Sequence, residues 1–296
     1  MANGSPFVGS LLHLRTLQAF QGLSSRHLAT LAQEVEEVIL ERGLPLLAPD
    51  APAQETFVIV DGRVSVGRGG TERALGPGDA VGFLELLGQG PSGSEARALE
   101  ETLALKLDGD GLREVCERQF SILDTLLINV AHQVIQSPDA LRAAVQGDAA
   151  AWSHPLPGPL DRVGRLLALH RSPAFPSASM DALVELSGHL TEVHLEAGEP
   201  LWQLGDPARW FLLLCQGSVR YRNPNAGWTV DVGPGGVPGM PTTLARGSRT
   251  VEATATAPVV ALRVETEPFL DVLEDHFEMA FSFLGRLARC VLGAQR

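Results

Sequence analysis

The chain has 296 residues, 45% of them hydrophobic, and a formal net charge of −12, which fits two domains of ordinary size that each bury a core. The acidic balance disfavours a nucleic acid or an anionic membrane surface as partner, because phosphate contacts need Lys and Arg and Lys106 is the only lysine. No apolar run reaches about 18 residues and no secretory signal opens the chain, so we expect a cytoplasmic protein without a membrane segment.

Short strands follow a short helix in the first part of the chain. The helix is expected over Ser24–Val35, with Ser24 as its N-cap. The strand-like runs are Val35–Leu40, Thr56–Val60, Arg63–Val66, Ala96–Leu99 and Leu103–Leu107. Turn signals at Asp61-Gly62 and Gly76-Pro77-Gly78 separate them. Many short strands at this spacing predict a β-barrel or jelly roll.

A long amphipathic helix is expected next, because apolar residues recur at steps of three and four. Its seam consists of Phe120, Leu123, Leu127, Val130 and Val134. Ser137-Pro138 ends this helix, and the Gly-, Ala- and Pro-rich residues 147–159 predict a linker. A short amphipathic helix over Leu160–His170 follows.

The second part repeats this order. A helix is expected over Ser179–Ser187. The strand-like runs are Leu190–Leu195, Trp210–Cys215, Ser218–Tyr221, Thr229–Val232, Thr250–Ala255 and Val259–Val264. A closing helix has its seam at Leu273, Phe277, Ala280, Leu284, Leu287 and Val291.

The two parts also share residues. A shift of 155 places residues 19–64 on residues 174–219, and 16 of the 46 positions are then identical. After two inserted residues, a shift of 157 places Gly76-Pro77-Gly78 on Gly233-Pro234-Gly235. A period this long indicates tandem globular domains. We predict one domain over 11–136, a linker over 137–159 and a second domain over 160–293, each mainly β with flanking helices.

The seams of the closing helices have two interpretations. Each seam packs on its own barrel, or the helices pair between the two copies or between chains. In the second interpretation Phe120, Leu127, Leu284 and Val291 form a contact surface for a protein partner or for a homodimer.

The order of elements, with motifs found in both copies, resembles the cyclic-nucleotide-binding domain family, the jelly roll of cyclic AMP receptor proteins. In copy one the motifs are Phe20 with Leu23-Ser24 and Leu28, Gly43-x-Pro45-Leu46, Phe57–Val60 with Gly62-x-Val64, Leu75-x-Pro77-Gly78-Asp79, and Ala98–Thr102 with Leu105. In copy two they are Phe175, Gly198-x-Pro200-Leu201, Leu212–Leu214 with Gly217-x-Val219, Gly233-Pro234-Gly235, and Arg249–Val251 with Ala253. The resemblance covers about 11–135 and 160–293 and implies two tandem barrels.

The resemblance also implies a ligand cassette. A short helix begins Phe-Gly-Glu, and an Arg follows about ten residues later. Amide groups at the start of that helix hold the cyclic phosphate, the Arg neutralises it, and the Glu accepts a hydrogen bond from the ribose 2′-hydroxyl.

Copy one departs from this cassette. Its residues are Val81-Gly82-Phe83, so that Phe83 stands where the Glu is expected and Glu85 comes two residues late. The slot of the Arg falls on Ser92, and Arg97 lies on the following strand.

Copy two departs as well. It has Pro238-Gly239-Met240, and its Arg slot is counted to Gly247, between Arg246 and Arg249. Either a changed loop length still brings Arg97, or Arg246 and Arg249, to an anion, or these arginines are solvated and both pockets have lost their ligand.

Other sites are not predicted. The enzyme motifs G-x-S-x-G, P-loop and H-E-x-x-H are absent from the sequence, so we expect no enzyme. His189, His194 and Glu196 resemble a metal cluster, but strand alternation places His189 opposite the other two; we expect neither a metal nor a cofactor. The three cysteines are expected to be reduced core residues.

We therefore expect a regulatory or scaffolding protein that acts by protein–protein interaction. The alternative is a sensor of a cyclic nucleotide, or of a related small anion, that signals through its closing helices. Many bacterial relatives carry a helix-turn-helix after the barrel, and we expect no such DNA-binding domain here, because only Gly293–Arg296 follow the second closing helix.

Overall fold

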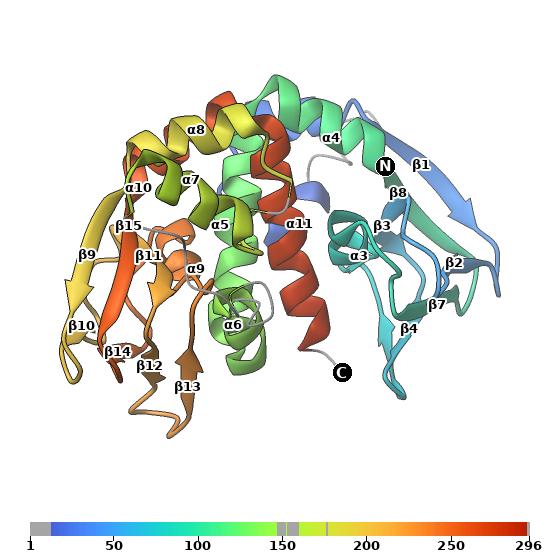
Figure 1. Ribbon diagram of the computed structural model, residues 1–296. Helices are drawn as coiled ribbons and strands as arrows, with labels where there is room; N and C mark the ends of the chain where they lie inside the picture. The colour runs from blue at the N-terminus through green and yellow to red at the C-terminus, as the bar shows by residue number, and fades with distance from the viewer. Residues whose placement is uncertain (1–12, 147–151, 153–159, 176, 295–296) are drawn as a thin grey trace. The chain divides into compact units, whose positions relative to one another are not determined.

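The computed structural model describes residues 13–146, 152, 160–175 and 177–294 (Figure 1). It divides into two compact units. Unit 1 contains Met1–Val130 and Leu284–Arg296, and unit 2 contains Ala131–Phe283. Each unit therefore includes part of the two long helices, α5 (Phe120–Gln136) and α11 (Phe277–Gly293).

Unit 1 is a sandwich of two four-stranded antiparallel sheets. One sheet has the order β1-β8-β3-β6 and the other β2-β7-β4-β5. The strands are β1 Val35–Leu40, β2 Pro45–Leu47, β3 Glu55–Asp61, β4 Val64–Arg68, β5 Thr71–Leu75, β6 Ala80–Val81, β7 Ser94–Ala98 and β8 Thr102–Asp108. The core between the sheets includes Leu40, Leu47, Phe57, Ile59, Val64, Ala96 and Ala104. Alternate residues of each strand supply this core, as expected for two packed sheets.

The helices of unit 1 are short, apart from the two long ones. They are η1 Gln18–Phe20, α2 Ser25–Leu31, α3 Phe83–Gly88 and α4 Gly109–Arg118. Ser24 caps α2 by accepting from the amide of His27, and Asp108 caps α4 by accepting from the amide of Gly111.

Unit 2 repeats the sandwich with sheets β11-β15-β9 and β10-β14-β12-β13. Its strands are β9 Thr191–Leu195, β10 Pro200–Trp202, β11 Trp210–Gln216, β12 Val219–Arg222, β13 Thr229–Val232, β14 Glu252–Ala255 and β15 Val259–Glu265. Its helices are α6 Pro138–Val145, α7 Arg162–Arg171, α8 Met180–Gly188, α9 Met240–Leu244 and α10 Thr266–Asp275. Four phenylalanines, Phe175, Phe211, Phe269 and Phe283, form a chain of edge-to-face contacts in its core.

The two predicted jelly rolls with flanking helices are confirmed, and the repeat appears in the strand registers. In unit 1, Leu47 pairs with Ala96 across β2 and β7; in unit 2, Trp202 pairs with Ala253 across β10 and β14. The glycine that the two copies share at Gly62 and Gly217 is required for steric reasons. Gly217 has φ +80°, and an added Cβ would lie 2.2 Å from the carbonyl oxygen of Pro258.

The structure differs from the sequence prediction after residue 136. Pro138 does end α5, but it also begins helix α6, because Ser137 caps that helix and Pro fits its first turn. Helix α6 packs in unit 2, where the carbonyl of Val145 accepts from the amide of Val237 at 2.8 Å. Of the Gly- and Pro-rich run 147–159, all but Trp152 lies outside the described residues. The boundaries 11–136, 137–159 and 160–293 stay a prediction from the sequence repeat.

The predicted contact residues of the closing helices are less exposed than expected. Leu127, Leu284 and Val291 are buried, and Phe120 is half-buried. Three of these four side chains are therefore covered by the chain itself and are not accessible to a partner. Their role as an external contact surface remains a prediction that requires α5 or α11 to move.

None of the described helices has the length and apolar character that crossing a bilayer requires. Cys116 and Cys215 are buried, Cys290 is partly buried, and all three are free thiols. Burial raises the pKa of the Cys116 and Cys215 thiols to about 12.

Candidate functional site

The two cassettes lie at equivalent turns. Gly82 precedes α3 with φ +85°, and Gly239 precedes α9 with φ +94°. A Cβ on Gly82 would lie 3.1 Å from the carbonyl oxygen of Glu55, and one on Gly239 would lie 2.7 Å from Nη1 of Arg249. Both turns therefore need glycine for conformation and for space.

Arg249 lies in the cassette of unit 2. Its side chain is 2% exposed. Nη1 donates to the carbonyl of Gly239 at 3.1 Å and to the hydroxyl of Thr242 at 2.9 Å, and Nη2 donates to the carbonyl of Trp210. The guanidinium thus donates its hydrogen bonds to the turn, to α9 and to the strand that surround it. Its Nε atom is buried and has no hydrogen-bond partner among the described residues.

Two tryptophans cover this guanidinium. The Cζ atom of Arg249 lies 4.0 Å from the ring centroid of Trp202 and 5.1 Å from that of Trp210, within the range of cation–π contacts. Burial lowers the pKa of Arg249 to about 10, against the opposing effects of Tyr221 and Asp206. Arg249 therefore remains charged at neutral pH.

Tyr221 accepts the hydrogen bond of the backbone amide at the start of the turn. The backbone N–H of Gly239 donates to the Tyr221 hydroxyl at 2.5 Å. Tyr221 is 2% exposed, and its burial raises the pKa of the phenol above its ordinary value. The first amide of the cassette of unit 2 is thus already paired.

Unit 1 holds a different polar cluster at its cassette. Glu85, on α3, is buried and accepts from the hydroxyl of Ser94 at 2.8 Å. Nη1 of Arg68, from β4, donates to the same hydroxyl at 2.8 Å and to the carbonyl of Ser92 at 2.6 Å. Arg68 Nη1 also lies 3.8 Å from Glu85 Oε1. Arg68 and Glu85 therefore neutralise each other where the ribose and phosphate contacts are expected.

The position of the family's Glu is apolar in both units. Phe83 is buried and packs edge-to-face on Phe20, with ring centroids 5.4 Å apart. Met240 is fully buried. Neither side chain can accept a hydrogen bond from a ribose hydroxyl in the way that a carboxylate does.

The strand registers locate the Arg slot in copy two. Ala96 and Ala253 hold the same place in the sheets of the two units. Four residues before them stand Ser92 and Arg249. The Arg slot of copy two therefore lies at Arg249 and not at Gly247, because two inserted residues precede it in that copy.

The structure does not bring every predicted residue to a cassette. Arg97 points to the outer face of β7, where its Nε lies 2.8 Å from Oε1 of Glu95. Arg246 is exposed beyond the end of α9, with φ +50°. Gly82, Phe83 and Glu85 do lie together in unit 1, as do Gly239, Met240 and Arg249 in unit 2.

Sequence reasoning missed Arg68, Tyr221, Trp202 and Trp210. A signal for Arg68 exists, since Val64, Val66 and Arg68 alternate and share the inner face of β4. Tyr221 lies 18 residues from Gly239 and only the fold brings them together.

A cavity of about 550 Å³ borders Arg249. Its lining includes Asp206, Arg209, Trp210 and Arg263. His189, His194 and Glu196, whose sequence pattern resembles a metal cluster, are not brought together as a group of possible ligands in the described part of the chain. His194 pairs instead with Glu192 at 2.9 Å.

Comparison with known proteins gives one family. The family model "Cyclic nucleotide-binding domain" matches residues 37–119 and 192–276. A CRP-like cAMP-activated global transcriptional regulator of Mycobacterium tuberculosis is 31% identical over 121 residues, which are 39% of this chain and 54% of the regulator. The chain thus spans about half the length of that relative.

Solved structures are similar at lower identity. A regulatory subunit of a cAMP-independent protein kinase A from Trypanosoma brucei is 20% identical, with 93% of this chain and 90% of that chain covered and a TM-score of 0.36. The N-terminal domain of a transcriptional regulator from Streptomyces coelicolor is 27% identical, with 42% of this chain and 90% of that chain covered and a TM-score of 0.38.

Proposed function

The chain belongs to the cyclic nucleotide-binding domain family, and from that membership we propose that it is a non-enzymatic regulatory protein that acts by binding a partner protein, with both ligand pockets filled by its own side chains. Its two copies of the fold supply the scaffold.

The Arg249 guanidinium is the observation that carries this proposal. A cyclic phosphate needs the charge of this arginine and the amides at the start of α9. Arg249 already donates to two carbonyls and one hydroxyl, and the Gly239 amide already donates to Tyr221. A ligand must therefore break these bonds and displace the guanidinium from Trp202 before it gains its own contacts.

Unit 1 supports the same conclusion by other means. Ser92 stands at the Arg slot and offers no positive charge. The nearby cation, Arg68, is held by Glu85 and Ser94 on the inner face of the sheet. A phosphate that approached Arg68 would meet the Glu85 carboxylate, and like charges repel at this distance.

A thermal-shift panel with cyclic AMP, cyclic GMP and cyclic dinucleotides tests the filled pockets. A ligand present at 100 times its dissociation constant stabilises a protein by about 2.7 kcal/mol. We expect an unchanged melting temperature for every nucleotide at millimolar concentration. A concentration-dependent rise would contradict the proposal.

A second candidate, a sensor of a small anion in unit 2, is favoured by one observation. Arg249 stands at the Arg slot, and its buried Nε has no hydrogen-bond partner in the described part of the chain. In that case Arg249→Ala weakens anion binding by about 1.5–3 kcal/mol, as loss of a charged hydrogen bond does. A titration of the wild type and of this variant separates the two candidates.

A further inference from the structure

The outer face of the unit 1 sheet has a hollow over Gly67, because glycine has no side chain. Gly67, on β4, is paired with Glu72 on β5 and with Glu95 on β7. Directly paired residues of neighbouring strands share one face, so two carboxylates flank a glycine. The strands surround a cavity of about 600 Å³ that Ser65, Gly67, Glu72, Gly93, Glu95 and Arg97 help to line.

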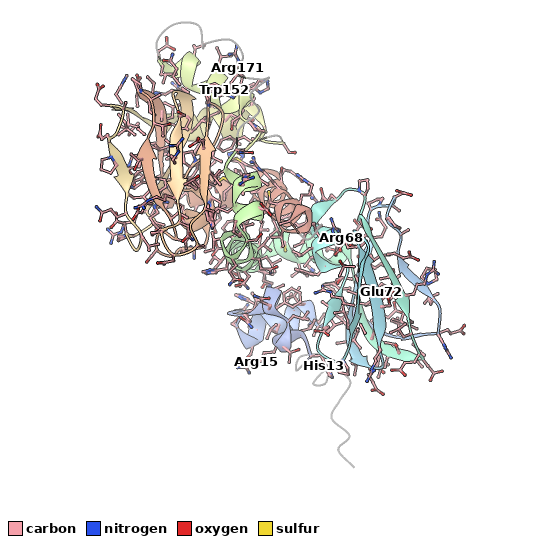
Figure 2. All side chains as sticks on the ribbon, turned by 90° about the horizontal axis from the view of Figure 1, so that it is seen from below. His13, Arg15, Arg68, Glu72, Trp152 and Arg171 are labelled. Atoms are coloured by element: carbon pink, nitrogen blue, oxygen red, sulfur yellow. The ribbon has the colours of Figure 1, made fainter. Side chains whose placement is uncertain are left out.

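Arg68, which follows Gly67, also lines this cavity. Its guanidinium is held on the inner face of the sheet, where it donates to Ser94 and lies 3.8 Å from Glu85. Arg68 and Glu72 are both labelled in Figure 2, on the strands of unit 1.

In unit 2, an arginine stands at the position equivalent to Gly67. Arg222 lies at the position of Gly67, 155 residues later, and pairs with Glu252 on β14. Both Nε and Nη2 of Arg222 donate to Oε2 of Glu252, at 2.9 and 2.6 Å. Glu252 is the counterpart of Glu95, which stands 157 residues earlier in the chain. The sheet of unit 2 therefore supplies from its own strand the guanidinium that unit 1 lacks.

The charges on the two faces differ accordingly. In unit 2, Arg220 and Arg222 pair with Asp231 and Glu252, so that cations and carboxylates balance. In unit 1, Arg97 pairs with Glu95 on the face of the two carboxylates that flank Gly67. The second arginine that lines the cavity, Arg68, is paired with Glu85.

Both carboxylates keep room for another donor. Arg97 donates to Oε1 of Glu95 at 2.8 Å, and the Ser65 hydroxyl donates to Oε1 of Glu72. A carboxylate offers about four lone-pair directions, so each can accept a further hydrogen bond.

We infer that the hollow over Gly67 receives an arginine side chain of a partner protein. This inference rests on the proposed function, in which the chain acts by binding a partner. A guanidinium is planar and carries five donors, so it has enough donors for both Glu72 and Glu95. In unit 2, Arg222 uses two of its donors on the single carboxylate of Glu252. Lysine has one compact charge and fits two separated carboxylates less well.

Three blocked tripeptides, Gly-Arg-Gly, Gly-Lys-Gly and Gly-citrulline-Gly, test this site on the full-length, ¹⁵N-labelled protein. Citrulline has nearly the shape of arginine without its charge. We expect the arginine peptide to shift the amide resonances of Gly67, Glu72, Gly93 and Glu95 in a saturable way, the lysine peptide to bind more weakly, and the citrulline peptide to cause no shift. An arginine peptide that leaves these resonances unchanged, or that acts no differently from citrulline, would overturn the inference.

Two variants form a matched pair for the same titration. Gly67→Arg restores to unit 1 the residue of unit 2; nothing lies nearer than 4.0 Å to an added Cβ at this position, so the variant should fold. We expect it to lose the shifts, because its own guanidinium occupies the hollow. Arg222→Gly opens the equivalent place in unit 2, and we expect new shifts there, at Glu252. Unchanged peptide binding by Gly67→Arg would also overturn the site.

The result is independent of the pocket experiment. If no cyclic nucleotide binds and the arginine peptide does not bind either, the proposed docking site is wrong, while the proposal of filled pockets is retained. If a cyclic nucleotide binds, the proposed function fails whatever the peptide does.

Discussion

Ser92 in unit 1 and Arg249 in unit 2 hold the same place in their sheets. The amide of Ser92 donates to the carbonyl of Ala51 at 2.9 Å, and the amide of Arg249 donates to the carbonyl of Asp206 at 2.8 Å. Ala51 and Asp206 are themselves 155 residues apart, the period of the repeat. The two copies therefore differ in side chain and agree in backbone at the position where the resemblance places the arginine of the family.

Arg249 is expected to stabilise unit 2. Arg249→Ala removes three hydrogen bonds and the stacking on Trp202. The carbonyls of Gly239 and Trp210 then keep their bonds from Thr242 and Thr243. We expect the free energy of unfolding, measured by denaturant titration, to fall by about 2–4 kcal/mol. The matched control is Arg246→Ala, in the exposed turn beyond the end of α9, which should change stability by about 0.5 kcal/mol or less. Equal effects of the two variants would contradict a structural role for Arg249.

Arg68 and Glu85 are expected to be energetically coupled. Their side chains are 13% and 10% exposed, so that removal of one leaves the other charge largely buried. We expect Arg68→Leu and Glu85→Leu each to cost about 2–3 kcal/mol, and the double variant to cost less than the sum by about 1 kcal/mol or more.

The exposed pair Arg220 and Asp231 provides the control for this double-mutant cycle. Its two hydrogen bonds of 2.7 and 2.8 Å have better geometry, but both side chains are about half exposed. A coupling energy of about 0.2–1 kcal/mol is expected there. A larger coupling in the exposed pair than in the buried one would be inconsistent with neutralisation inside the cassette.

Gly239 should tolerate a side chain less well than another turn glycine. Gly205 in the same unit has φ +90° and nothing within 4 Å of an added Cβ, whereas Gly239 has Nη1 of Arg249 at 2.7 Å and Cα of Phe211 at 3.3 Å. Gly205→Ala is expected to cost about 1–2 kcal/mol through its backbone conformation alone. Gly239→Ala should cost more, since the guanidinium must also move, and thermal unfolding of both variants measures the difference.

Stability is expected to fall at alkaline pH through the buried thiols. The folded protein holds the Cys116 and Cys215 thiols protonated up to a pKa of about 12, whereas the unfolded chain releases these protons near the ordinary value of 9.0. Because their folded pKa values are raised, the stability that they contribute is complete below pH 9 and is lost as the pH rises toward 12.

Each thiol changes the free energy of unfolding by at most about 1.4 kcal/mol per pH unit in this window. A Cys116→Ala/Cys215→Ala variant should therefore lose less stability than the wild type between pH 9 and pH 10.5. Parallel pH profiles for the two proteins would show that these thiols do not cause the loss.

The tandem fold could be predicted from the sequence because its signals are local. The repeat, the turn glycines Gly62 and Gly217, and the alternation within strands each follow from a few neighbouring residues. Helix α6 was missed because Ser137-Pro138 was interpreted as a stop signal, although a proline in the first helical turn can also start a helix.

The site was predicted only in part, because its contacts are not local. The apolar substitutions at Phe83 and Met240 are visible in the sequence beside the turn glycines. The contacts of Tyr221 and Trp202 with the cassette of unit 2 are not visible there, since both residues come from strands far away in the chain. Arg249 was predicted as a candidate ligand residue, but its burial against Trp202 depends on the tertiary structure.

Calorimetric titration of the full-length protein with cyclic AMP, cyclic GMP and cyclic dinucleotides tests the filled pockets most directly. We predict no heat beyond dilution for any of them, with the protein folded. Micromolar binding that is lost in Arg249→Ala would contradict this prediction and would identify unit 2 as a nucleotide sensor.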